Sequence, residues 1–141
     1  MIYLPDVNIW IALTSNRHIH HPIAIGWFRG VDADTIAFCR ITELGFLRLL
    51  TNAHVMGKDV LSPAQAWRTY DAWRTDDRVV FLSERVTFSE QWRRRGNQIT
   101  GGVNAWTDAY LATFAEHMDA TVVTLDRRFS QFGEATVISL I

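Results

Sequence analysis

The chain has 141 residues, of which 48% are hydrophobic and 21% are charged, and this fits one globular domain with its own core. Its formal net charge of −1 excludes a protein that holds nucleic acid by bulk electrostatic attraction, although it leaves room for a local basic rim. The single cysteine, Cys39, excludes an internal disulfide framework and a cysteine-rich zinc site.

The first half of the chain begins with the apolar stretch "YLPDVNIWIAL", which Asp6 and Asn8 interrupt. Pro5 suits the end of a strand better than its middle, so the stretch predicts a strand followed by a helix. Further on, Thr42 is the expected cap of a helix that ends near Asn52. The strands expected in this half are 2–4 and 35–39, and the expected helices are 9–13, 22–28 and 41–52.

The second half continues the alternation of short apolar runs and helical patterns. Ser62 is a good N-cap and Pro63 a good first helical residue, so a helix is expected from 63 to about 74. The other helices expected are 88–99 and 104–118, and the strands are 78–82, 120–126 and 135–141. This alternation predicts an α/β fold: one domain over 1–141 with a central, mostly parallel sheet flanked by helices.

No apolar run approaches the roughly 20 residues that a membrane-spanning helix needs. The N-terminus also lacks the basic segment that precedes the apolar part of a secretory signal. We therefore expect a cytoplasmic protein with no membrane contact.

Four acids fall at the ends or starts of the expected elements: Asp6, Glu43, Asp108 and Asp126. Ligands of an open parallel sheet bind beyond the carboxyl ends of its strands, where these acids would gather. Carboxylates this close repel one another, by about 4 kcal/mol for a pair at about 4 Å and an effective dielectric near 20, unless a cation joins them. Hard oxygen ligands favour Mg²⁺ or Mn²⁺. Taken singly, each acid could instead complement a helix dipole or form a turn.

Two amides accompany these acids. Asn8 stands two residues after Asp6 and could orient a carboxylate or a metal-bound water without adding charge. Asn104 lies one helical turn before Asp108, so the two share a helix face.

With these motifs the chain resembles PIN domains, and among them the ribonuclease toxins of the VapC family from bacterial toxin–antitoxin pairs. The stretches that carry the resemblance are "YLPDVNIWIAL", "ITELGFLRLLTN", "WTDAYLATFAEHMDA" and "TVVTLDRRF". It implies a metal-dependent endoribonuclease in which Asp6, Glu43, Asp108 and Asp126 form the acidic quartet. Asp6 and Asp108 would hold the Mg²⁺ or Mn²⁺ most directly. It also implies an RNA substrate, a cognate antitoxin and a homodimer.

Basic residues near the expected site are candidates for contact with RNA phosphates: Arg93, Arg94, Arg95 and Arg127. A solvated helical face is the ordinary explanation of the run at 93–95.

Other functions fit less well. A haloacid-dehalogenase-type phosphatase needs a second acid where Asn8 stands and a late lysine, whereas the only lysine, Lys58, lies mid-chain. The missing late lysine counts equally against a phosphoacceptor receiver domain. A PIN-domain RNA-processing nuclease that is not a toxin, and a catalytically silent binding module of the same fold, remain the alternatives.

Overall fold

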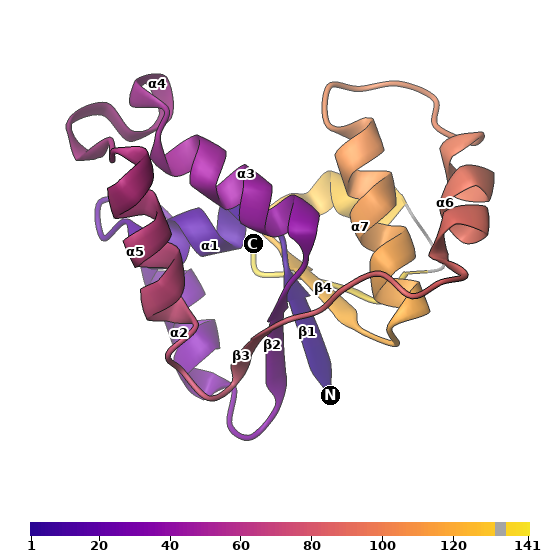
Figure 1. Ribbon diagram of the computed structural model, residues 1–141, viewed down its shortest axis with the longest axis horizontal. Coiled ribbons are helices and arrows are strands. Elements are labelled where there is room, and N and C mark those ends of the chain that lie inside the picture. Colours follow the sequence, from indigo (N-terminus) through magenta and orange to yellow (C-terminus); the bar gives the residue numbers. More distant parts are fainter. Residues whose placement is uncertain (132–134) are drawn as a thin grey trace.

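In the computed structural model, which describes residues 1–131 and 135–141, five parallel strands form one sheet in the order β3-β2-β1-β4-β5 (Figure 1). The predicted mostly parallel sheet is confirmed, because every pairing between these strands is parallel. The strands are β1 (Ile2–Pro5), β2 (Thr35–Phe38), β3 (Val79–Phe81), β4 (Thr121–Thr124) and β5 (Val137–Ser139).

Helices cover both faces of this sheet (Figure 1). On one side lie α1 (Val7–Thr14), α2 (His21–Gly30), α3 (Arg40–Leu50), α4 (Ala53–Met56) and α5 (Pro63–Trp73). On the other side lie α6 (Phe88–Gly96) and α7 (Ala105–His117). Two 3₁₀ helices, η1 (Gly57–Asp59) and η2 (Arg127–Gln131), complete the described elements.

Two hydrophobic cores form because side chains alternate between the two faces of each strand. Val123 points into the core beneath α1, α3 and α5, which contains the stacked pair of Trp10 and Phe38 with ring centroids 3.9 Å apart. Val122 and Leu4 point the other way, into the core shared with α7. Both faces of β1 and β4 are therefore buried, as expected of central parallel strands.

The capping signals were predictive for α5. Ser62 is its N-cap, with its hydroxyl accepting from the Gln65 backbone N–H at 3.2 Å, while the Gln65 side chain accepts from the Ser62 N–H at 2.9 Å. Such a reciprocal capping box satisfies two backbone donors that the helix itself leaves unpaired.

The predicted cap of α3 was wrong by three residues. The helix begins after Cys39, and Thr42 accepts a hydrogen bond from the Cys39 backbone N–H at 3.0 Å from inside the first turn. Asn52 does not simply end this helix, since its side chain accepts from the His54 N–H at 2.9 Å and caps the unpredicted helix α4.

The order of the strands places a topological switch at the middle of the sheet. The chain leaves β1 for β2 on one side, and β4 later pairs with β1 on the other side. The carboxyl ends of β1 and β4 are where ligands bind in such sheets. Within the described residues, no helix is both long enough and apolar enough to cross a membrane.

Candidate active site

Asp6 follows directly on the last residue of β1 and is the N-cap of α1. Its Oδ1 accepts from the Val7 backbone N–H at 2.7 Å, and its own N–H donates to the Val123 carbonyl at 2.8 Å. The backbone of β4 and the start of α1 thus fix this carboxylate. Burial is the largest influence on it and raises its pKa, against the opposing effect of its hydrogen bonds.

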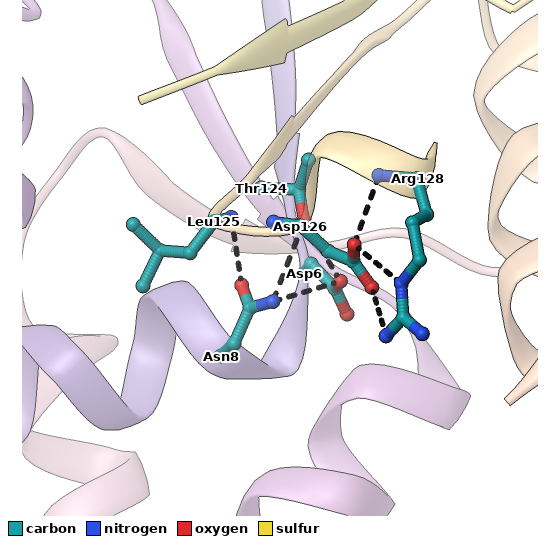
Figure 2. A network of polar contacts seen from close by, with 6 residues as sticks. All are labelled: Asp6, Asn8, Thr124, Leu125, Asp126 and Arg128. Carbon is teal, nitrogen blue, oxygen red and sulfur yellow. Dashed lines mark hydrogen bonds and ion pairs between the residues drawn. The ribbon is translucent and has the colours of Figure 1, made fainter. Parts of the chain in front are cut away.

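Two uncharged side chains connect Asp6 to the end of β4 (Figure 2). The Thr124 hydroxyl donates to Asp6 Oδ2 at 3.1 Å and accepts from the Asp126 backbone N–H at 3.0 Å. Asn8 Nδ2 donates to the same Asp6 oxygen at 3.3 Å, and Asn8 Oδ1 accepts from the Leu125 N–H at 3.3 Å. The expected role of Asn8 in orienting the first acid therefore agrees with its contacts, although its effect on activity stays a prediction.

Thr124 was missed by the reading of the sequence. It is fully buried at the end of a strand that is otherwise Val-rich and stands two residues before an acid. A buried hydroxyl must find partners, so a polar residue at the carboxyl end of a buried strand was the available sign.

Asp126 lies just beyond β4 and is held by Arg128 (Figure 2). The guanidinium donates from Nε to Oδ1 at 3.1 Å and from Nη2 to Oδ2 at 3.2 Å, and the Arg128 N–H donates to Oδ1 at 2.9 Å. These contacts lower the pKa of Asp126, with the side-chain hydrogen bonds as the largest cause. Asp126 is therefore the acid of the site whose charge is locally neutralised.

Asp108 comes to the same place from the first turn of α7. Its pKa is raised to about 6, first by burial and then by the charges of Asp6 and Asp126. Asp6, Asp108 and Asp126 therefore lie close enough for their charges to act on one another, whereas the sequence led us to expect Glu43 in the same group.

Asp108 also lines a pocket of about 340 Å³. Its wall includes the turn at Gly101 and Gly102, whose φ angles of 131° and 98° lie in the region that glycine alone adopts freely. Asn104, the expected supporting residue, is exposed and lines this pocket as well. Asp126 and Arg128 complete the part of the lining that concerns the site.

Glu43, the fourth predicted acid, lies in the first turn of α3 and is 7% exposed. Its Oε1 accepts from Arg40 Nη1 at 2.5 Å, and Arg40 in turn covers the Phe81 ring. The carboxylate also contributes, after burial, to raising the pKa of Tyr70 to about 12. The contact that the structure gives this carboxylate is therefore with Arg40 rather than with any of the other three acids.

The predicted RNA-contacting arginines differ in their surroundings. Arg93 and Arg94 are exposed on α6, whereas Arg95 forms an ion pair with Glu116 of α7, with only 13% and 15% of the two side chains exposed. Arg95 thus joins α6 to α7, and we retain only Arg93, Arg94 and Arg127 as candidates for RNA contact.

The donor set of the site matches a hard divalent cation in kind, since it consists of carboxylate oxygens with amide and hydroxyl support. The pKa of Asp108 is raised first by burial and then by the negative charges of Asp6 and Asp126, and a bound cation would relieve that second effect. As the side chains stand, no three acids, histidines or cysteines among the described residues are grouped closely enough to hold one ion. Asp126 in particular is engaged by Arg128 at both oxygens.

Comparison with known sequences gives consistent matches. Residues 3–135 match the PIN domain family. The chain is 38% identical over 135 residues to Ribonuclease VapC41 of Mycobacterium tuberculosis, and the alignment covers 92% of each chain.

Comparison with solved structures gives the same fold. The structure of VapBC-1 from nontypeable Haemophilus influenzae matches with a TM-score of 0.71 and 20% identity, over 99% of this chain and 98% of that one. The crystal structure of Mycobacterium tuberculosis VapC20, described as a sarcin-ricin loop cleaving toxin, matches with a TM-score of 0.66 and 18% identity. That second match covers 94% of this chain and 95% of the other.

Proposed function

The chain belongs to the PIN domain family and, within it, to the VapC ribonucleases, and we propose that it is a divalent-metal-dependent endoribonuclease toxin. The observation that carries the proposal is the coupled group of Asp6, Asp108 and Asp126, in which burial and then the charges of the other two acids raise the pKa of Asp108 to about 6. The repulsion between these carboxylates is unfavourable in the free protein, and a bound cation would remove it.

We assign each residue of the site a role from its surroundings. Asp6 and Asp108 are the acids that would hold the cation, for which we propose Mg²⁺ or Mn²⁺. When bound there, the ion supplies an activated water and stabilises charge on the phosphodiester that is cut. Asn8 and Thr124 hold Asp6 in one orientation by donating to the same oxygen. A fixed ligand geometry of this kind commonly governs metal affinity.

Glu43 and Asp126 complete the proposed acidic quartet as outer members. Each is paired with an arginine, Glu43 with Arg40 at 2.5 Å and Asp126 with Arg128 at 3.1 Å. We assign them to binding or orienting waters rather than to direct contact with the ion. Asn104 is exposed at the N-terminus of α7 and would act at the rim of the pocket.

We further propose RNA as the substrate, contacted at its phosphates by Arg93, Arg94 and Arg127, and an antitoxin as the protein partner. The likeness to VapC41 and to VapBC-1 supports the antitoxin. We also propose that the protein forms a homodimer and is cytoplasmic. In the same proposal the whole chain, 1–141, forms one domain.

The test is cleavage of total bacterial RNA by wild type and by Asp6→Asn, each with Mg²⁺, with Mn²⁺ and with a chelator. We expect wild type to cut only with a divalent ion, and Asp6→Asn to lose about 10- to 100-fold in rate, the usual order when the surroundings of a bound metal are disturbed. Asp71→Asn on the exposed face of α5 is the matched control, because it removes one charge from a helix that carries none of the proposed site residues.

Equal cutting by wild type and Asp6→Asn would point to a contaminating nuclease and refute the site. Growth arrest on induction, relieved by a small protein that co-purifies with the chain, separates a toxin from an RNA-processing enzyme. A protein that neither binds the ion nor cuts RNA would be a silent binding module.

A further inference from the structure

Arg128 lines the acidic pocket and directly contacts Asp126, an acid of the coupled group. Its side chain is 84% exposed, yet its guanidinium meets both oxygens of Asp126, at 3.1 Å and 3.2 Å. Its charge also acts on Asp108, whose pKa it lowers against the other influences. Arg128 therefore faces the interior of the site although most of its surface meets solvent.

This contact conflicts with the proposed function of the site. The backbone and side chain of Arg128 together fill three of the roughly four acceptor positions of the Asp126 carboxylate, which leaves about one for a cation or its waters. Neutralisation by Arg128 is also what keeps the pKa of Asp126 low. A permanent pair would thus weaken the contribution of this acid to the site.

We propose that Arg128 exchanges partners during the reaction: it leaves Asp126 when the divalent ion binds and then holds a phosphate of the RNA substrate. The proposal rests on the proposed ribonuclease function. It makes Arg128 a substrate-positioning residue and also the internal competitor of the metal ion.

Three features of the structure favour this exchange over a fixed pair. The planar guanidinium fork fits a carboxylate and a phosphate equally well, so the same side chain can serve both partners. Because the side chain is largely exposed, the pair with Asp126 is weak and costs little to break. The Arg128 backbone N–H keeps its own bond to Asp126 Oδ1 at 2.9 Å, so Asp126 stays in place when the side chain leaves.

The neighbouring wall provides a place for the phosphate. Gly101 and Gly102 carry no side chain into the pocket that Arg128 and Asp108 line. An RNA phosphate that approaches Asp108 therefore meets the guanidinium within the same pocket of about 340 Å³.

The metal arm of the test is a double-mutant cycle with Arg128→Ala and Asp126→Asn, followed by Mn²⁺ titration with the EPR signal of the free ion. In the wild-type background, Arg128→Ala should tighten Mn²⁺ binding about two- to fivefold, the range that corresponds to losing an exposed competing ion pair. In the Asp126→Asn background the same change should alter the Mn²⁺ affinity by less than about 1.5-fold, because the competitor has already lost its partner.

The substrate arm uses a labelled RNA hairpin that wild type cuts. Arg128→Ala should raise KM about tenfold while kcat stays within about twofold, as loss of a charged hydrogen bond to a bound phosphate implies. Arg128→Lys should show a smaller rise, since lysine keeps the charge but not the fork. Arg29→Ala, which removes an exposed charge at the end of α2, is the control and should change neither value.

The opposite signs of the two effects distinguish exchange from simple damage, because a misfolded site would weaken both metal and RNA. Weaker or unchanged Mn²⁺ binding in Arg128→Ala, an equal gain in both backgrounds, or an unchanged KM would each overturn the proposal. If wild type itself neither binds Mn²⁺ nor cuts RNA, the proposed function fails instead.

Discussion

Asp108→Asn should stabilise the protein near neutral pH, although it removes a proposed metal ligand. In the folded chain the pKa of Asp108 is raised from 3.8 to about 6, first by burial and then by Asp6 and Asp126. A carboxyl group with a raised folded pKa contributes no penalty below its unfolded value. It destabilises the fold increasingly as the pH rises from the unfolded value to the folded value, and the penalty is constant above that. Asparagine has nearly the same shape and escapes this cost.

The magnitude follows from the size of the shift. A rise of roughly two units corresponds to about 3 kcal/mol of unfolding free energy if the group were fully buried. Asp108 is only partly buried, so solvent screening reduces the expected gain to about 1–1.5 kcal/mol. The gain should be small near pH 4, develop between the two pKa values and be complete above about pH 6.5.

Urea denaturation of wild type and Asp108→Asn at about pH 4 and about pH 7.5 measures this difference directly. Adding Mg²⁺ at the higher pH should then stabilise wild type more than the variant, because only wild type keeps the full ligand set. A variant that is less stable than wild type at pH 7.5, or equally affected at both pH values, would refute the claim that the acids repel one another in the free site.

Three further substitutions test other parts of the structure. Thr124→Val should cost about 1–3 kcal/mol in urea denaturation, since it leaves the half-buried Asp126 N–H without its acceptor, and should also reduce the RNA cleavage rate. Gly45→Ala should cost about 1–3 kcal/mol, because a Cβ there would lie 2.7 Å from Val7 Cγ2 where α3 meets α1. Arg95→Ala should lower stability by about 1–3 kcal/mol by leaving Glu116 unpaired, while the KM for RNA stays unchanged.

Each of these has a matched control. Thr124→Ser keeps the hydroxyl and should retain most of the activity. Gly26→Ala lies within a helix with no heavy atom within 4 Å of the new Cβ, so it should stabilise by about 0.5–1 kcal/mol. Arg94→Ala is on the exposed side of α6 and should change stability by less than about 0.5 kcal/mol. If Gly45→Ala matched Gly26→Ala, the close approach of α1 and α3 would be wrong.

The sequence predicted the fold well where one local pattern dominates. Ser62 and Pro63 set the start of α5, and the largely apolar run at 120–126 identified a central strand. The sequence predicted the ends of elements less well where tertiary contacts determine them. The strand expected at 120–126 stops at Thr124 because the Leu125 N–H bonds the Asn8 side chain instead of a neighbouring strand. That partner is 117 residues away along the chain, so no local pattern could indicate it.

The site shows the same division. Asp6 and Asp126 could be located because acids beside buried strands require a partner, and the order of the strands brings them together. The pairing of Glu43 with Arg40 could not be inferred with the same force, since helix spacing allows the contact without requiring it. The Arg128 contact depends on the turn at the start of η2, which aims the side chain back over the pocket.

Pro5 explains why Asp6 is available to a ligand. The Asp6 N–H donates to Val123 of β4, so alternation along the strand directs the nitrogen of Pro5 toward β2. The pairing of β1 with β2 involves only Ile2 and Tyr3, whereas the pairing with β4 continues to Pro5. A residue that cannot donate a hydrogen bond therefore stands where the ladder to β2 has already ended, at no cost to the ladder with β4. Because the two ladders end at different residues, β1 separates from β2 just before Asp6, and the carboxylate lies at an opening of the sheet rather than inside it.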